Sequence, residues 1–333
     1  MKQLGAGMAI AGSGSATPKV ALDNQDLSQI VETSDEWIRT RTGIQQRYVA
    51  SPEESLAGVA AQAAERAIAM AETTSAEIDL ILLATSTPDD LFGSASQIQS
   101  LLGASRAVAF DLTAACSGFI FGLVTASQFI RTGVYQNVLL IGADLLSRWT
   151  DWSDRRTCVL FGDGAGAVVL QANPERDRLL GFELCSDGTH NQSLNLAYQG
   201  KSQPLFKDVS ISHGSYYPIT MNGKEVYRFA VAKVPEVISK ALFRAQLTAE
   251  QVDWLLLHQA NQRIMDAVAQ RLNISSDRAI SNLAKYGNTS AASIPLALDE
   301  TVRQETIQPG DIIAASGFGA GLTWGAAIFQ WGR

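Results

Sequence analysis

One of the three cysteines in the chain, Cys116, lies where a cysteine could act as a nucleophile. It follows an apolar segment at residues 107–111 and opens a helical pattern that begins CSGF. A helix N-terminus presents unpaired backbone N–H groups, and these groups stabilise a thiolate together with the helix dipole. Small neighbouring residues leave room for an acyl chain. A buried cysteine that only fills space is the alternative, and Cys158 and Cys185 fit that description.

Two further polar side chains follow apolar segments later in the chain. His258 closes the run Val252–His258, where a histidine can serve as a donor or base, or as a structural residue at a sheet edge. Asn288 precedes an apolar helical pattern at residues 291–302, a position that also suits a helix cap. The glycine-rich segment 316–321 (SGFGAG) follows a predicted strand, and its backbone N–H groups could face a developing oxyanion.

Segments with helical patterns and segments with strand patterns alternate along the chain, and these elements must position the residues named above. The alternation predicts an α/β fold with buried sheets. Helices are expected at residues 53–70, 95–102, 116–131 and 224–245, and strands at 7–12, 78–84, 107–111, 137–142, 252–258, 311–316 and 322–331. Two more strands are expected to flank a turn at residues 162–166, and most of 186–218 is expected to be loop.

The predicted elements recur along the chain at a nearly constant offset. Residues 252–258 mirror 78–84 at an offset of 174, residues 278–281 mirror 106–109 at 172, and Gly317 mirrors Gly142 at 175. This repetition indicates an internal duplication of two α/β halves, residues 1–172 and 173–333, about a pseudo-twofold axis. Two unrelated α/β domains are the alternative. In the duplicated arrangement Cys116 and Asn288 precede matching helices, and His258 lies across the cleft.

Composition excludes several classes of protein. The 333 residues are 46% hydrophobic and 18% charged, which excludes a disordered chain. The net charge of −7 argues against a nucleic-acid binder. Three cysteines do not make a disulfide framework and indicate a reducing compartment. No apolar run is long enough to span a bilayer, and residues 1–18 are too weakly apolar for a signal peptide, so a soluble cytoplasmic protein without a membrane partner is expected.

The segments around these residues resemble those of the thiolase-like condensing enzymes. TAACSGF contains Cys116, LLHQAN contains His258, YGNTSAAS contains Asn288, and GFGAGLTWG stands near the end. With TSDEWI at 33–38, RTG at 41–43 and FGDGAG at 161–166, they are most similar to the β-ketoacyl-acyl-carrier-protein synthase III family. The resemblance implies a thiolase-like fold of two duplicated halves in α-β-α-β-α layers, and a homodimer.

The resemblance also implies an acyltransferase of fatty-acid biosynthesis that condenses a short acyl-CoA, typically acetyl-CoA, with malonyl-acyl carrier protein. Cys116 would carry the acyl group, and His258 and Asn288 would stabilise the enolate that forms when CO2 leaves. The backbone N–H groups of Cys116 and Ala320 would form the oxyanion hole, although many members of the family carry glycine in place of Ala320. No cofactor or metal is implied, because acyl-CoA is a substrate and no cluster of metal ligands occurs.

Binding residues follow from the same resemblance. It assigns CoA binding to Trp37, Arg41, Thr42 and Arg155, carrier-protein binding to Gln259, Ala260, Asn261, Gln262, Arg263, Arg228 and Arg271, and the acyl pocket to Phe92 and Phe318. Because both this chain and the carrier protein are acidic, the carrier would have to bind through a local basic patch.

Three other functions remain open. One is a starter synthase of secondary metabolism or another acyltransferase on this scaffold, and another is a non-catalytic subunit that binds carrier protein. A plain cysteine hydrolase is the third. The complete set of Cys116, His258 and Asn288 favours decarboxylative condensation.

Overall fold

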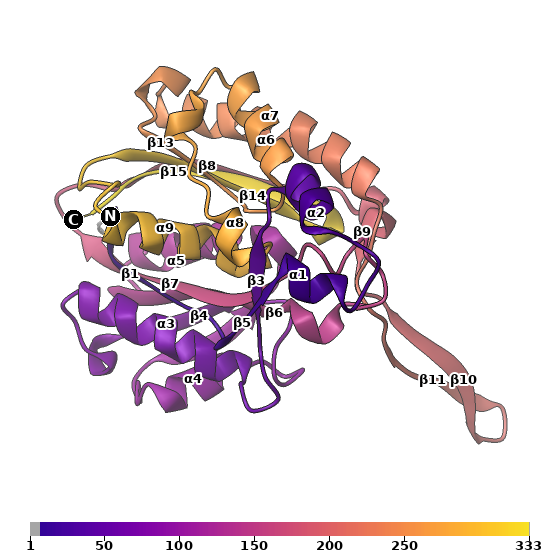
Figure 1. Ribbon diagram of the computed structural model, residues 1–333. Helices are drawn as coiled ribbons and strands as arrows, with labels where there is room; N and C mark the ends of the chain where they lie inside the picture. The colour runs from indigo at the N-terminus through magenta and orange to yellow at the C-terminus, as the bar shows by residue number, and fades with distance from the viewer. Residues whose placement is uncertain (1–6, 333) are drawn as a thin grey trace.

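Figure 1 shows the computed structural model, which describes residues 7–332 as two stacked β-sheets with helices between them and on both outer faces. The first sheet has the order β1-β7-β6-β4-β5. Its strands are β1 (Gly7–Ala16), β4 (Leu80–Ala84), β5 (Val108–Leu112), β6 (Asn137–Leu145) and β7 (Asp163–Asn173). Strands β6, β4 and β5 run parallel, whereas β7 is antiparallel to both β1 and β6.

The second sheet repeats this arrangement with one strand fewer. Its order is β13-β14-β15-β8, and β13 and β14 form the parallel pair. Its strands are β8 (Leu179–Ser186), β13 (Trp254–Leu257), β14 (Ile312–Gly319) and β15 (Thr323–Gln330). The segment expected to match β5 forms only an isolated parallel bridge between Leu255 and Ala279. The two sheets thus draw on residues 7–173 and 179–330.

The helices form the outer and central layers of the molecule (Figure 1). Helices α3 (Leu56–Met70) and α4 (Ala95–Leu101) cover the first sheet, and α6 (Gly223–Ala245) and α7 (Gln262–Arg271) cover the second. Helices α5 (Gly118–Arg131) and α9 (Ser293–Arg303) lie between the sheets. The α/β fold with α-β-α-β-α layers is therefore confirmed. None of the described helices is both long and apolar enough to cross a membrane.

Shorter elements complete the described chain. They are β2 (Val20–Asp23), α1 (Asn24–Ser28), α2 (Asp35–Thr42), β3 (Gln46–Val49), β9 (Leu194–Asn195), β12 (Thr220–Met221) and α8 (Leu283–Tyr286).

Burial on both faces explains why the central strands were recognisable in the sequence. All five residues of β4, LILLA, are buried, because α3 packs on one side of the sheet and α5 on the other. The helix α3 is rich in alanine, and its buried alanines pack against β1 and β7. Small side chains permit this close approach between helix and sheet, so local composition and tertiary packing agree.

The prediction of a turn at residues 162–166, flanked by two strands, is wrong. Gly164 and Gly166 lie near the start of the single strand β7, which Gly162 directly precedes, and residues 151–160 before it are mostly turns. The reason is close packing against α9. A Cβ atom at Gly166 would lie 2.6 Å from the backbone nitrogen of Leu296. The glycines therefore allow a strand and a helix to touch.

The prediction that most of residues 186–218 form a loop is also wrong. This segment contains a β-hairpin of β10 (Tyr198–Phe206) and β11 (Val209–Tyr216) that projects far from the body of the molecule (Figure 1). Every residue of both strands is exposed. A hairpin that buries neither face does not need alternating apolar and polar residues, so its sequence lacks the usual strand signal.

Candidate active site

The three residues expected to carry the chemistry line one cavity of about 130 Å³. Cys116 follows β5, His258 follows β13, and Asn288 precedes α9, so the cavity lies where both halves of the chain meet. Their exposed fractions are 8%, 2% and 7%. The structure thus brings together the three side chains that the sequence predicted to meet, with Cys116 and His258 at the carboxyl ends of strands from the two halves.

Cys116 lies in a short 3₁₀ turn, Ala115–Ser117, and not in the first turn of α5 itself. Burial raises the pKa of its thiol to about 12, and the nearby carboxylate of Asp144 acts in the same direction. The expected stabilisation of a thiolate by the helix N-terminus is thus outweighed by desolvation. In the resting protein Cys116 is a protonated thiol.

His258 is held by contacts that leave one ring nitrogen for the cavity. Its Nδ1 lies 2.7 Å from the Ser293 hydroxyl, and that hydroxyl oxygen also accepts the Gln259 backbone N–H at 3.3 Å. The Ser293 hydrogen is then free to donate to Nδ1, so that Nε2 carries the ring hydrogen and can donate it. Burial lowers the pKa of His258 to about 3, and the imidazole is therefore neutral. The ring of Phe318 packs edge-on against it, with centroids 5.5 Å apart.

Asn288 is held by both its side chain and its backbone. Its Oδ1 accepts the backbone N–H of Ser290 at 2.9 Å, at the start of the turn that leads into α9. Its own backbone N–H donates to the Leu160 carbonyl, and its carbonyl accepts the N–H of Gly162. With the amide oxygen engaged, the Nδ2 hydrogens are the part of the side chain available to a molecule in the cavity.

The end of β14 lies directly against the nucleophile. A Cβ atom at Gly319 would stand 2.7 Å from the backbone nitrogen of Cys116. The next residue, Ala320, is tied to the segment before Cys116 through Thr323, whose hydroxyl lies 3.1 Å from the Ala320 carbonyl and 3.0 Å from that of Ala114. The two segments whose N–H groups were assigned to an oxyanion hole are thus neighbours.

Three of the four residues assigned to CoA gather at the surface. The Trp37 ring lies 4.8 Å from the guanidinium carbon of Arg41 and 5.3 Å from that of Arg155. Thr42 does not join them. It is buried, its hydroxyl donates to the Ile38 carbonyl at 2.7 Å, and it accepts the N–H of Ile44 at 3.0 Å. Its hydroxyl is already engaged at the end of α2.

Comparisons with known proteins agree with this geometry. Two family models match the chain, 3-oxoacyl-[acyl-carrier-protein] synthase III over residues 110–188 and the C-terminal part of the same enzyme over residues 242–331. A β-ketoacyl-[acyl-carrier-protein] synthase III of Nostoc sp. is 74% identical over 98% of this chain and 99% of its own. This chain belongs to the 3-oxoacyl-[acyl-carrier-protein] synthase III family.

Solved structures of family members have the same fold. The 3-oxoacyl-[acyl-carrier-protein] synthase III of Aquifex aeolicus matches with a TM-score of 0.90 at 42% identity, over 98% of this chain and 100% of that one. The priming β-ketosynthase of the R1128 polyketide pathway matches with a TM-score of 0.91 at 32% identity, over 100% of this chain and 98% of that one. The thiolase-like fold is therefore confirmed.

The residues assigned to the carrier protein divide into surface and interior positions. Gln259 is buried, and its side chain donates to the carbonyls of Leu257 and Ile280, so it cannot contact a partner protein. Ala260 and Asn261 line the cavity. Arg228, Arg263 and Arg271 are exposed, and Gln262 is half-buried.

Two hydrogen bonds join the segment that carries residues assigned to CoA binding to residues assigned to carrier-protein binding. The Nδ2 of Asn261, the residue that caps α7, donates to the Arg41 carbonyl at 3.1 Å. The guanidinium of Arg263 donates to the Thr40 carbonyl at 2.7 Å. The start of α7 is thereby held against the end of α2, next to Trp37.

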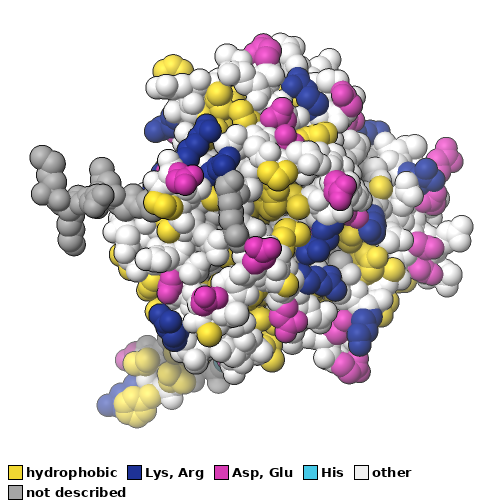
Figure 2. Space-filling model, turned by 90° about the vertical axis from the view of Figure 1, so that its left-hand side faces the viewer, with side chains coloured by type: hydrophobic (Ala, Val, Ile, Leu, Met, Phe, Trp, Pro, Cys, Tyr) yellow, Lys and Arg dark blue, Asp and Glu magenta, His cyan; other side chains and the backbone are white. Residues whose placement is uncertain are grey.

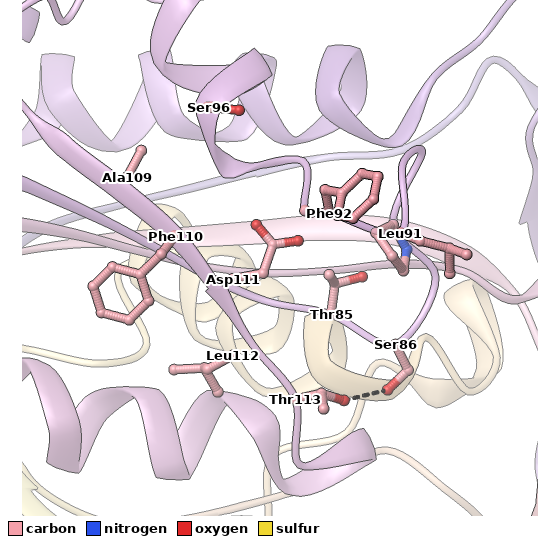
Figure 3. A pocket seen from close by; sticks show the side chains of 12 residues that line it. Thr85, Ser86, Leu91, Phe92, Ser96, Ala109, Phe110, Asp111, Leu112 and Thr113 are labelled. Carbon is pink, nitrogen blue, oxygen red and sulfur yellow. Dashed lines mark hydrogen bonds between the residues drawn. The ribbon is translucent and has the colours of Figure 1, made fainter.

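The two residues assigned to the acyl pocket lie apart. Phe318 lines the cavity with Cys116, but Phe92 is fully exposed and lies elsewhere in the same chain. Figure 3 shows Phe92 beside Leu91 at a surface hollow bordered by β5, where the Ser86 and Thr113 hydroxyls lie 3.3 Å apart. Within one chain Phe92 is therefore not part of the cavity.

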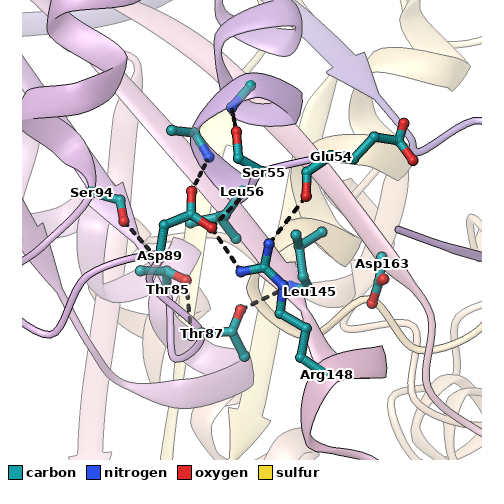
Figure 4. A network of polar contacts seen from close by, with 12 residues as sticks. Glu54, Ser55, Leu56, Thr85, Thr87, Asp89, Ser94, Leu145, Arg148 and Asp163 are labelled. Atoms are coloured by element: carbon teal, nitrogen blue, oxygen red, sulfur yellow. Dashed lines mark hydrogen bonds and ion pairs between the residues drawn. The ribbon is translucent and has the colours of Figure 1, made fainter. Parts of the chain in front are cut away.

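The loop that carries Phe92 is held by Asp89. Its carboxylate accepts the backbone N–H groups of Leu56 and Ala57 at the start of α3 and pairs with Arg148 at 2.7 Å (Figure 4). Arg148 also donates to the Glu54 carbonyl. Asp89 is thus a structural residue of this loop.

Sequence reasoning missed the polar side chains behind the cavity, Ser293, Ser290 and Asp144. Asp144 lies within the apolar strand β6, and nothing in the sequence except its charge suggested that it lies near the cavity. Among residues 7–332, no group of three or more His, Cys, Asp or Glu side chains is placed to hold a metal ion.

Proposed function

We propose that this chain catalyses the decarboxylative Claisen condensation of a short acyl-CoA, such as acetyl-CoA, with malonyl-acyl carrier protein. The product is a β-ketoacyl-acyl carrier protein, and the reaction begins fatty-acid synthesis. The observation that carries this proposal is the joint placement of Cys116, His258 and Asn288 around one buried cavity, in a chain of the 3-oxoacyl-[acyl-carrier-protein] synthase III family.

The first step transfers the acyl group to Cys116. The sulfur attacks the thioester carbonyl, the backbone N–H groups of Cys116 and Ala320 stabilise the oxyanion, and the bond to the CoA sulfur breaks. The thiol hydrogen of Cys116 ends on the sulfur of CoA, so the step consumes no external base. Acyl-CoA is a substrate, and the reaction as proposed needs no cofactor.

The second step uses the other two side chains. Malonyl-carrier protein loses CO2, and the electron pair moves to the thioester oxygen as an enolate, which Nε2–H of His258 and Nδ2–H of Asn288 stabilise. A neutral imidazole is suited to this role, because it donates a hydrogen bond without surrendering a proton. The enolate carbon then attacks the acyl-cysteine, and the Cys116 sulfur leaves as a thiolate and takes a proton from solvent.

Surface residues beside the cavity would hold the two carriers of acyl groups. Trp37, with Arg41 and Arg155 around its ring, offers a flat face and positive charge to the adenine and phosphates of CoA. On the face shown in Figure 2, basic and acidic side chains are interspersed. Because an acidic carrier protein would bind through local positive charge, we assign carrier docking to the exposed arginines of α6 and α7, which are Arg228, Arg263 and Arg271.

We further propose that the protein is a cytoplasmic homodimer. The strand β5 lies at the edge of its sheet, and an unpaired edge is a template for pairing with a second chain. Exposed apolar side chains gather there, namely Leu91, Phe92, Val108 and Phe110. The cytoplasm is where acyl-CoA and malonyl-carrier protein would be met.

The test is a pair of assays with purified protein. Radiolabelled acetyl-CoA should label Cys116, and subsequent addition of malonyl-carrier protein should discharge the label into a condensed product. Cys116→Ala should abolish labelling but keep malonyl decarboxylation, whereas His258→Ala and Asn288→Ala should impair decarboxylation. Full condensation by Cys116→Ala would refute the assignment, and a label that is only hydrolysed would indicate a hydrolase.

Similarity to the R1128 priming β-ketosynthase supports one second candidate, a starter synthase with a different acyl group. A panel of acyl-CoA substrates in the same assay separates the two. Preference for acetyl-CoA supports the fatty-acid role, and preference for a longer or branched acyl-CoA supports the starter role.

A further inference from the structure

Two hydroxyl groups, those of Ser117 and Thr323, meet beside Cys116 and are used by none of the steps above. Ser117 ends the 3₁₀ turn Ala115–Ser117 that contains the nucleophile, and Thr323 follows the turn Ala320–Leu322 at the start of β15. Their oxygen atoms lie 2.8 Å apart, and Ser117 is fully buried. Each hydroxyl therefore belongs to a segment that supplies one N–H group of the assigned oxyanion hole.

The distances show how these hydroxyls bond. Because the two oxygens lie 2.8 Å apart, one hydroxyl donates to the other. The Ser117 oxygen also lies 2.7 Å from the Ala114 carbonyl, and the Thr323 oxygen lies 3.0 Å from that carbonyl and 3.1 Å from the carbonyl of Ala320. If Thr323 donates to Ser117, the Ser117 hydrogen goes to Ala114. If Ser117 donates to Thr323, the Thr323 hydrogen goes to one of the two carbonyls. In both arrangements a hydrogen bond of Thr323 joins the two segments.

This hydroxyl pair is the polar link between the two segments. Within residues 7–332, no hydrogen bond between backbone groups connects residues 114–118 to residues 316–323. The turn after β14 is otherwise bonded to its own half of the chain, where Leu322 exchanges two backbone hydrogen bonds with Asp187, the residue that follows β8. The position of the Ala320 N–H relative to the Cys116 N–H therefore depends on the Thr323 hydroxyl and on close backbone packing.

We propose that Thr323 is a positioning residue for acyl transfer, with Ser117 as its hydrogen-bond partner. The link holds the Ala320 N–H and the Cys116 N–H at a fixed separation, so that both reach the thioester oxygen as it becomes an oxyanion. Such donors act only over a narrow range, about 2.7–3.1 Å from the position that the oxyanion takes. This inference rests on the proposed acyl transfer to Cys116 and on the oxyanion hole assigned to these two N–H groups.

The test is single-turnover labelling of variants with radiolabelled acetyl-CoA. Thr323→Val keeps a branched side chain of the same shape but removes the hydroxyl. It should slow acyl-enzyme formation by about tenfold, the rate equivalent of one buried hydrogen bond. Ser117→Ala should slow the reaction less, because Thr323 can still donate to the Ala114 carbonyl. Thr323→Ser keeps the hydroxyl and should restore most of the rate.

Two further readouts distinguish positioning from a loss of stability. The double variant Ser117→Ala, Thr323→Val should be no slower than Thr323→Val alone, because both substitutions remove the same link. In a Cys116→Ala background, Thr323→Val should retain most of the malonyl decarboxylation, because stabilisation of the enolate is assigned to His258 and Asn288. A substitution that only loosened the fold would slow both half-reactions.

Thr301→Val is the matched control, because Thr301 is also half-buried but its hydroxyl donates to carbonyls of its own helix, α9. Thermal unfolding of each variant verifies that it is folded, and Thr323→Ala, which adds no atoms, replaces Thr323→Val if the latter does not fold. Acyl-enzyme formation by the Thr323 variant at the rate of Thr301→Val would overturn the proposal, as would an equal loss of decarboxylation. If the wild-type protein forms no acyl-enzyme, the proposed function fails instead, which is a distinguishable result.

Discussion

Replacing Gly319 by alanine should disable acyl transfer while leaving the fold intact. Gly319 ends β14, and its φ of −169° is extended backbone that any residue can adopt, so alanine introduces no backbone strain there. The added Cβ would instead meet the nucleophile, at 2.7 Å from the backbone nitrogen of Cys116 and 3.0 Å from its Cβ. The new methyl group would therefore contact the backbone N–H group of Cys116, which is assigned to the oxyanion hole.

The magnitude follows from this overlap. Ordinary van der Waals contacts of a Cβ atom begin at 3.4 Å, so the Cys116 backbone must move by roughly 0.7 Å to accept the new atom. A displacement of about 1 Å at a reacting group costs on the order of 10²-fold in rate, and loss of one oxyanion donor costs about 10²–10³-fold. We expect kcat/KM for acyl-enzyme formation to fall by about 10²-fold, or about 2.7 kcal/mol. The cost to folding should be about 1–3 kcal/mol.

The assay is acyl-enzyme formation from radiolabelled acetyl-CoA, with urea unfolding to verify the fold. Gly188→Ala is the matched control, because a Cβ atom at Gly188 meets nothing within 4 Å. In a Cys116→Ala background, Gly319→Ala should retain most of the malonyl decarboxylation, which depends on His258 and Asn288. A folded Gly319→Ala protein that acylates at the wild-type rate would refute the reasoning.

Three further predictions test other parts of the structure. Burial lowers the pKa of His258 to about 3, below its unfolded value near 6.5, so its contribution to stability is present above pH 6.5 and is lost as pH falls towards 3. Between pH 7.5 and 4.5 the wild type should lose about 3 kcal/mol more unfolding free energy than His258→Gln, and equal losses in urea titrations would contradict this. Trp37→Ala should raise the KM for acetyl-CoA with little change in the rate of Cys116 alkylation, and an unaltered KM would exclude stacking on Trp37. Replacing residues 199–215 by an Asn-Gly turn should change the unfolding free energy by less than about 0.5 kcal/mol, because every residue removed is exposed, and a larger loss by urea titration would show that the hairpin packs on something.

Much of the fold could be predicted because its signals are local. The strand β4 is an unbroken apolar run because both of its faces are covered, and α3 shows a helical period because one side packs on the sheet. The repetition of such elements at a constant offset revealed the two halves. Where an element buries neither face, or packs closely on a distant segment, the local sequence pattern that would predict it is absent. The hairpin of β10 and β11 buries nothing, and the glycines at the start of β7 reflect contact with α9, which lies far away in the sequence.

Some residues of the candidate site could likewise be recognised in the sequence, and others could not. Cys116, His258 and Asn288 were recognisable because each stands next to a predicted element and within a distinctive motif. Asp144 and Ser290 were not, since a charged residue inside a strand and a serine in a turn have many ordinary explanations. Phe92 was assigned to the acyl pocket by resemblance, yet within one chain it is exposed, in a loop that Asp89 and Arg148 anchor.

The sequence by itself predicted most of the elements, their repetition along the chain and the three residues around the cavity, because these follow from short-range periodicity and motifs. Only the tertiary structure decided their chemical state. Cys116 is a protonated thiol and His258 a neutral donor because both are removed from water by segments distant in the chain, and desolvation acts through space.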